Sequence, residues 1–113
     1  QVVFLKDNYD AMIVHNVYFW LNEDVTESEK NNFEKGIKSF LDAVDRVQMY
    51  EIGTPAKTPD REVVDHSFAY SMFVWFNTVG DHNAYQKHEA HDVFINSFKA
   101  LWAKVQVLDY EAN

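Results

Sequence analysis

The chain of 113 residues contains no cysteine. Disulfide bonds, thiolate metal sites and cysteine nucleophiles are therefore excluded together. Long apolar runs are also missing, because no segment approaches the roughly 20 apolar residues that a membrane-spanning helix needs. We therefore expect a chain that does not cross a membrane and that folds without disulfides.

Basic residues are few, with 10 Lys and Arg against 18 Asp and Glu and a net charge of −8. A surface this acidic repels the phosphates of nucleic acids and of anionic lipids. No basic stripe along the chain counteracts this repulsion. We therefore expect neither nucleic acid nor a membrane surface as a partner.

The length suits one domain, and apolar residues, at 47%, supply a core. The aromatic content of 16% is high for this length and indicates more than one apolar surface to cover. The chain starts at Gln1 and not at Met, so a cytoplasmic location and an exported form both stay open, with the cytoplasm favoured. We divide the chain into an extension over residues 1–11, with an edge strand as one option, and a domain over residues 12–113.

Four segments have the β-branched and aromatic content of strands. They cover residues 12–21, 47–52, 63–76 and 104–110. The first and third are apolar on both faces, so both faces should be covered. Pro55 and Pro59 lie in a loop over residues 54–62, and the length of this loop makes it a candidate lid.

Two segments have helical spacing. In the first, Thr26 and Glu29 form a capping-box pattern, and an apolar stripe of period 3.6 follows, so we expect a helix to about Asp45. The second opens where Thr78 can cap with Asp81. Its apolar stripe comprises His91, Phe94, Ile95, Phe98, Leu101 and Trp102.

The order strand, helix, strand, strand, helix, strand is the split β-α-β pattern of ferredoxin-like α+β folds, here with a four-stranded antiparallel sheet. Two helices cover only one face of such a sheet. A monomer would leave the aromatic side chains of the other face in water as a large patch. We therefore expect two sheets to pair face to face in a homodimeric α+β barrel.

One set of residues resembles a known family. Tyr85, His88 and His91 form a Tyr-x-x-His-x-x-His element, followed by Phe94, Trp102, Asp109 and Tyr110. Together with His15 in the first strand, this pattern is similar to the stress-responsive A/B barrel domain family, often called Dabb. The resemblance covers nearly the whole chain and implies a dimeric α+β barrel of ferredoxin-like protomers.

The resemblance also implies site residues. A plant polyketide cyclase of the family performs an aldol cyclisation without a cofactor, and its catalytic Tyr and His look like Tyr85 and His91. Its pocket histidine on the first strand looks like His15, whereas a further pocket histidine matches Tyr70 here. The family usually has proline where this chain has Glu89. We take Tyr85 and His91 as candidate catalytic residues and His15, Tyr70 and His88 as candidate pocket residues.

The residues themselves leave two interpretations open for each position. His91 lies in the middle of the apolar helix stripe, either as a core histidine with satisfied hydrogen bonds or as an acid/base group in a pocket. Tyr85 lies about 120° from His91 around a straight helix, so the two converge only if the helix breaks. Glu89 does not force that break.

Metal binding has little support in the spacing. His88 and His91 are three residues apart, but no third ligand recurs nearby, and His15 could join them only through folding. We therefore expect no metal and no cofactor. His66 and His82 fall near the ends of elements and are expected on the surface.

Three functions stay open. The first is a homodimer that binds a small hydrophobic molecule between sheet and helices. The second is a cofactor-independent enzyme, a cyclase, isomerase or monooxygenase, that uses His91 and Tyr85 in the same pocket. The third is a purely structural oligomer related to stress.

Overall fold

The structure, a computed structural model, describes residues 12–112. The expected extension over residues 1–11 lies outside the described residues. The element order is β1 (Ile13–Leu21), α2 (Glu27–Ala43), β2 (Met49–Gly53), β3 (Tyr70–Phe76), α3 (Val79–Lys87), α4 (Glu89–Phe98), a 3-10 turn (Lys99–Leu101) and β4 (Trp102–Glu111). The strands form one antiparallel sheet in the order β2-β3-β1-β4, which confirms the ferredoxin-like fold.

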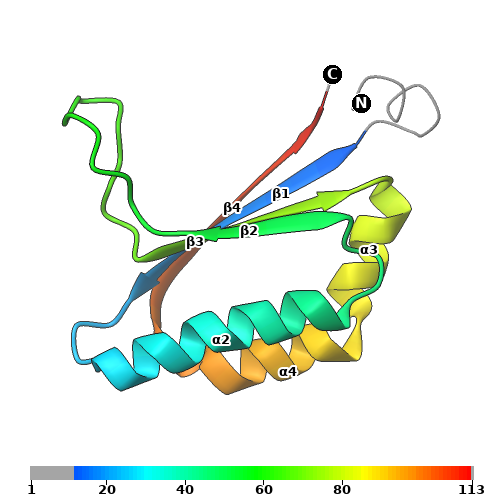
Figure 1. Cartoon of the computed structure of the whole chain (residues 1–113), viewed down its shortest axis with the longest axis horizontal. Helices are drawn as coiled ribbons and strands as arrows, with labels where there is room; N and C mark the ends of the chain where they lie inside the picture. The colour runs from blue at the N-terminus through cyan, green and yellow to red at the C-terminus, as the bar shows by residue number, and fades with distance from the viewer. Residues whose placement is uncertain (1–11, 113) are drawn as a thin grey trace.

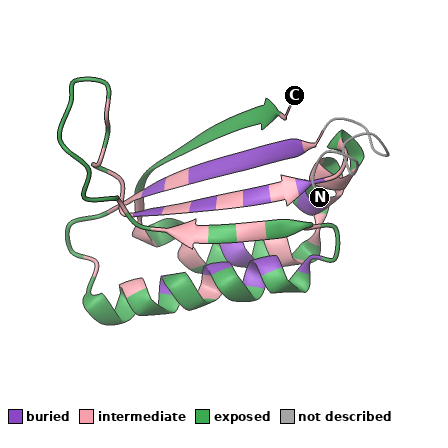
Figure 2. Ribbon diagram, turned by 45° about the horizontal axis from the view of Figure 1, so that its top comes forward, coloured by how far each residue is buried: buried purple, intermediate pink, exposed green. Residues whose placement is uncertain are grey.

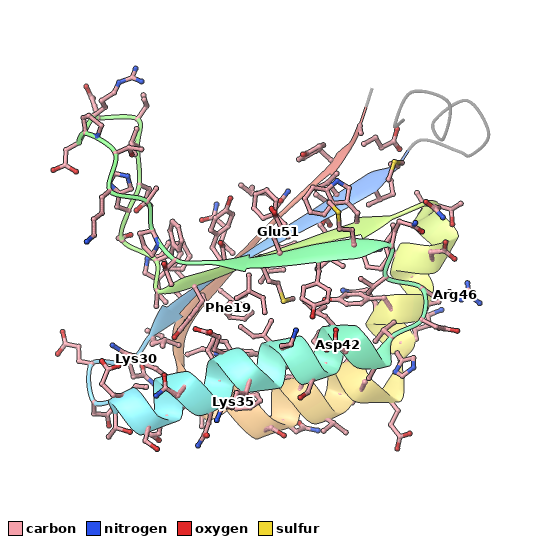
Figure 3. The ribbon with its side chains drawn as sticks, in the orientation of Figure 1. Phe19, Lys30, Lys35, Asp42, Arg46 and Glu51 are labelled. Atoms are coloured by element: carbon pink, nitrogen blue, oxygen red, sulfur yellow. The ribbon has the colours of Figure 1, made fainter. Side chains whose placement is uncertain are left out.

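All helices lie on one side of this sheet, with α2 and α4 along its length and α3 at one end (Figure 1). Strand alternation therefore gives the sheet an inner and an outer face. In Figure 3, Phe19 of β1 points toward the helices, whereas Glu51 of β2 lies on the opposite side. The two central strands are the most buried, and β4 at one edge is largely exposed (Figure 2).

Aromatic side chains fill the space between the inner face and the helices. The Phe33 ring of α2 is fully buried and lies 5.1 Å from the Phe19 ring and 6.0 Å from the Phe94 ring, measured between centroids. Such clusters of edge-to-face and stacked rings stabilise cores beyond the burial of area alone. This core fixes α2 and α4 against the sheet.

Helix α2 begins with the expected capping box. The Thr26 hydroxyl accepts a hydrogen bond from the Glu29 amide, and the Glu29 carboxylate accepts one from the Thr26 amide. Its apolar stripe, with Phe33, Ile37, Phe40 and Leu41, is buried against the sheet. The helix ends at Ala43, two residues before the expected end.

The prediction of a third strand over residues 63–76 was wrong for the first half of that range. Strand β3 begins at Tyr70, which pairs with Phe19 of β1, and its other neighbour β2 ends at Gly53 opposite Ser71, so the residues before Tyr70 have no partner on the β2 side. Val63 is 80% exposed, and Asp65 accepts hydrogen bonds from the Ser67 amide and hydroxyl in a local turn. The connection between β2 and β3 is therefore longer than expected and projects from one end of the sheet (Figure 1).

The second helical region is two helices. Helix α3 ends at Lys87, and His88 adopts extended dihedral angles of φ −68° and ψ 143° before α4 begins at Glu89. The His88 Nδ1 atom accepts a hydrogen bond of 2.9 Å from the Ala90 amide, so its side chain caps α4. Within residues 12–112, no helix is long and apolar enough to span a membrane.

Candidate functional site

A cavity of about 210 Å³ lies between the inner face of the sheet and the helices α3 and α4. It is lined mainly by apolar side chains, with polar groups from β1, α3, α4 and β4 among them. The polar residues of the lining are His15, His82, Tyr85, Gln86, His91 and Asp109. Val105 and Val107 of β4 line the cavity yet remain 40% and 46% exposed, so the cavity opens to solvent beside β4.

His15 and Asp109 are two of the polar residues that line this cavity. They face each other across the β1–β4 ladder, and His15 Nδ1 lies 2.5 Å from Asp109 Oδ1. Burial lowers the pKa of His15 below its ordinary value, and the hydrogen bond to Asp109 offsets that effect only in part. Because a carboxylate only accepts, the neutral imidazole donates from Nδ1 and keeps a lone pair on Nε2.

Tyr85 is fully buried and belongs to α3. Its ring centroid lies 5.4 Å from that of His15 and 5.0 Å from that of Phe76. Burial, with a smaller contribution from the Asp109 charge, raises the pKa of Tyr85 well above its ordinary value. The phenol therefore stays protonated and serves as a hydrogen-bond donor inside the cavity.

His91 reaches the same cavity because the helix breaks at His88. Its ring centroid lies 5.5 Å from the Tyr85 ring and 5.7 Å from the Phe40 ring, both in edge-to-face geometry. Burial lowers the pKa of His91, and the nearby Asp92 partly counteracts this effect. The break thus brings Tyr85 and His91 to the same cavity, which a straight helix would prevent. It forms without the proline that is usual at this point in the family that the sequence resembles.

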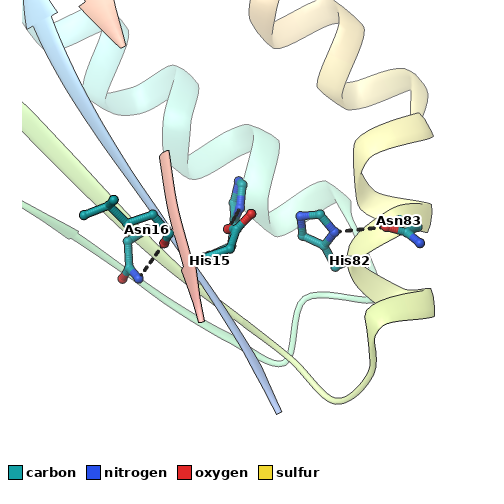
Figure 4. Close-up of polar contacts among 6 residues, drawn as sticks. His15, Asn16, His82 and Asn83 are labelled. Atoms are coloured by element: carbon teal, nitrogen blue, oxygen red, sulfur yellow. Dashed lines mark hydrogen bonds and ion pairs between the residues drawn. The ribbon is translucent and has the colours of Figure 1, made fainter. Parts of the chain in front are cut away.

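His82 was expected on the surface, but it lines the cavity. It lies on α3 three residues before Tyr85, on the same side of the helix, and its ring centroid lies 5.0 Å from that of His15 (Figure 4). Its Nδ1 atom is 3.1 Å from the Asn83 side-chain oxygen. The sequence contained one signal for this position. If the Tyr85 side chain points into the cavity, a residue three positions earlier on the same helix should do so too.

Asp109 was part of the quoted family pattern but had no assigned role. Its position follows from strand alternation, since Val105 and Val107 precede it on the inner face of β4. The missing information was the register of β4 against β1, which pairs Asp109 with His15. Sequence alternation alone does not specify that register.

Tyr70 and His88 do not line this cavity. Tyr70 lies on the inner face of β3 opposite Phe19, toward the other end of the sheet, where its ring packs on Phe33. Burial, with the nearby Glu34 carboxylate, raises the pKa of Tyr70. His88 is half-buried, caps α4 and lines a separate groove between α2 and α4.

The polar groups of the cavity have complementary chemistry. Tyr85 offers a proton donor, and the neutral imidazoles of His15 and His91 each offer an acceptor near it. Groups of this kind can hold a ligand oxygen and accept a proton from a neighbouring carbon or hydroxyl. The remaining lining, including Phe19, Phe94 and Trp102, is apolar and suits a hydrocarbon or aromatic body.

The fold and this cavity define the chain as a ferredoxin-like α+β domain with a cluster of polar side chains on the inner face of its sheet. The family model described as Stress Responsive A/B Barrel Domain, or Dabb, matches residues 13–112. The chain belongs to the Dabb family. No curated protein matches it.

Solved structures of similar fold cover most of the chain. A hydroxynitrile lyase from Passiflora edulis is similar with a TM-score of 0.77 and 16% identity, over 91% of this chain and 94% of its own. A Dabb family protein with a ferredoxin-like fold from Mesorhizobium loti has a TM-score of 0.74 and 21% identity, over 92% and 99%. A dimeric ferredoxin-like protein of unknown function from Thermobifida fusca has a TM-score of 0.74 and 16% identity, over 90% and 92%. At these identities the likeness shows the shared fold.

The lowered pKa of His91 makes a prediction about stability and pH. The unfolded chain binds a proton at His91 near the ordinary pKa of 6.5, whereas the folded chain binds it only at lower pH. Between these values the unfolded state holds more protons, so stability should be complete above the ordinary pKa and should fall as pH falls. In urea unfolding at about pH 7 and about pH 5, wild type should lose more stability than His91→Gln.

His15 serves as an internal reference for this measurement, because its lowered pKa contributes the same trend to both proteins. Because His91 is only the smallest of the causes that shift the pKa of His15, the difference between the two slopes reports mainly on His91. Equal slopes for wild type and His91→Gln would contradict the burial of the imidazole.

Proposed function

We propose that the protein binds a small, mostly apolar molecule with a carbonyl or hydroxyl oxygen in the cavity lined by Tyr85, His91 and His15. The observation that carries this proposal is the buried Tyr85 phenol. Tyr85 lines the cavity together with His15 and His91, and burial keeps its phenol protonated by raising its pKa. A buried donor of this kind favours a ligand that brings an acceptor.

The size of the cavity narrows the ligand class. An apolar cavity of about 150 Å³ in another protein holds benzene, and the cavity here is about 210 Å³. One aromatic ring with a short substituent therefore fits the space. The acidic surface, with a net charge of −8, favours a neutral molecule over an anion.

Two ligands of nearly equal shape test the role of Tyr85. Acetophenone carries a carbonyl oxygen that ethylbenzene lacks, so calorimetric titration should show tighter binding of acetophenone. A net hydrogen bond contributes about 0.5–1.5 kcal/mol, which corresponds to roughly 3- to 10-fold in Kd. Tyr85→Phe should remove this preference and leave ethylbenzene binding unchanged. A preference that persists in Tyr85→Phe would refute the assigned donor.

The protein is also proposed to act as a homodimer through the outer face of the sheet. Aromatic side chains gather there, since Tyr18, Trp20, Phe73 and Trp75 are only partly buried and Leu108 is 51% exposed. Burying about 600 Å² of such surface would contribute about 15 kcal/mol before the costs of association. Similar structures from Thermobifida fusca and Jannaschia are described as dimeric.

A pair of matched substitutions tests the dimer. Leu108 on the outer face and Val93 on α4 are apolar and 51% and 58% exposed, so a glutamate at either position should leave the protomer folded. We expect light scattering to give a dimer for wild type and Val93→Glu, and a monomer for Leu108→Glu with an unchanged far-UV circular dichroism spectrum. A monomeric wild type at micromolar concentration, or a dimeric Leu108→Glu, would contradict the proposed interface.

A second candidate function is acid/base catalysis on a carbonyl compound without a cofactor. The convergence of Tyr85 and His91 favours it, because the phenol can stabilise charge on a carbonyl oxygen while the imidazole accepts a proton from the adjacent carbon. The Passiflora edulis structure of similar fold is named a hydroxynitrile lyase, so this scaffold is compatible with an enzyme active site.

Deuterium exchange at the acetophenone methyl group tests this second function. His91 would remove a methyl proton, Tyr85 would hydrogen-bond the enolate oxygen, and deuterium from D₂O would return to the carbon. Proton NMR should show exchange faster than in buffer, a loss of this catalysis in His91→Gln, and no loss in His66→Gln, which changes a histidine of the exposed loop. Exchange at the buffer rate in the presence of bound acetophenone would leave only the binding function.

A further inference from the structure

His82 carries an unusual ring nitrogen. Its Nε2 atom is buried and has no hydrogen-bond partner among the described residues. Buried polar atoms in proteins nearly always have partners, so such an atom calls for an explanation. The other ring nitrogen, Nδ1, lies 3.1 Å from the Asn83 side-chain oxygen and can donate to it, which leaves the Nε2 lone pair free (Figure 4).

Two further side chains that can bind a metal lie close to His82. His82, His15 and Asp109 each offer one ligand atom, and these three atoms lie within 4.8 Å of one another. They come from α3, β1 and β4, so no local spacing in the sequence brings them together. The side chain of Asp109 is 46% exposed at the open edge of the cavity, which provides a path for an ion from solvent.

We propose that His82, His15 and Asp109 form a binding site for a divalent transition metal ion of the zinc class. This proposal departs from the sequence-based expectation of a metal-free site, which considered only His88 and His91 with His15. It goes beyond the proposed small-molecule function and does not depend on it.

The ligand set selects the class of metal. Two imidazoles and one carboxylate are typical of zinc and of other late divalent metals, whereas magnesium and calcium prefer oxygen ligands throughout. Bonds of about 2.0–2.2 Å require ligand atoms roughly 3–4 Å apart, which small side-chain rotations can reach from the observed separations. The contact between Asn83 and the far nitrogen of His82 resembles the outer partners that orient metal-binding histidines.

Metal binding would rearrange one hydrogen bond. The ion would take the place of the proton between His15 Nδ1 and Asp109, and His15 would carry its proton on Nε2 instead. Three protein ligands leave at least one coordination position open in a tetrahedral site. That position would face the cavity, within reach of a water molecule or a ligand oxygen near Tyr85.

Titration of chelator-treated protein with zinc chloride tests the site. We expect one zinc ion per chain by calorimetry, and a rise in Tm of roughly 10 °C when free zinc exceeds Kd about 100-fold. Cobalt(II) in place of zinc should show the visible d–d absorption of a four-coordinate site. His82→Leu and Asp109→Asn should each weaken zinc binding by roughly 100-fold or more, since even partners behind metal ligands change affinity by about 10–100-fold.

The His66→Gln variant is the matched control. His66 Nδ1 lies 3.4 Å from Asp60 in the exposed loop, so it is a similar histidine–carboxylate pair outside the cavity. Zinc binding should be unchanged in this variant. Absence of zinc binding to wild type, full binding by His82→Leu or Asp109→Asn, or loss of binding in His66→Gln would each overturn the proposal. If His82→Leu does not fold, as judged by circular dichroism, Asp109→Asn decides alone.

Discussion

The turn at His88 determines which side chains meet in the cavity. Tyr85 and His91 would lie on different sides of one continuous helix, and neither could then share a ligand with the other. The break depends on a local hydrogen bond, because the His88 imidazole accepts from the Ala90 amide and so caps α4 as a Ser or Asp often does. Glu89 at the first position of α4 adds a favourable negative charge at the helix N-terminus.

The rest of the site depends on the sheet against which these helices pack. The Phe33 and Phe94 rings hold α2 and α4 on the inner face, and the β1–β4 ladder brings Asp109 opposite His15. Among the described residues, no helix covers β4 as α2 and α4 cover the central strands, so the cavity stays open beside this edge. Among residues 12–112 no helix covers the outer face, where the proposed second copy of the chain would pack.

Much of the fold could be predicted from local patterns. The capping box at Thr26 and the apolar stripe after it specify α2, and the β-branched and aromatic composition specifies β1, because both signals act within a few residues. The start of β3 could not be predicted in the same way, since Phe68 and its neighbours have strand composition but no partner on the β2 side. Pairing partners are a property of the whole sheet and not of the segment.

The candidate site was predictable only in part. Tyr85, His91 and His15 were identified by resemblance and by their apolar surroundings, and the structure places all three around one cavity. His82 and Asp109 were missed because their positions depend on the rotation of α3 and on the register of β4. The convergence of Tyr85 and His91 was also undecided, because a histidine cap has no strong sequence signature comparable with proline.

A crystal structure of the protein grown with acetophenone tests the central claim most directly. The account predicts extended backbone at His88, with the Tyr85 and His91 side chains on the same cavity and the carbonyl oxygen about 2.7–3.0 Å from the Tyr85 hydroxyl. A continuous helix through residues 79–98, with Tyr85 and His91 on separate sides, would contradict it. So would an acetophenone molecule bound elsewhere while core side chains fill the cavity.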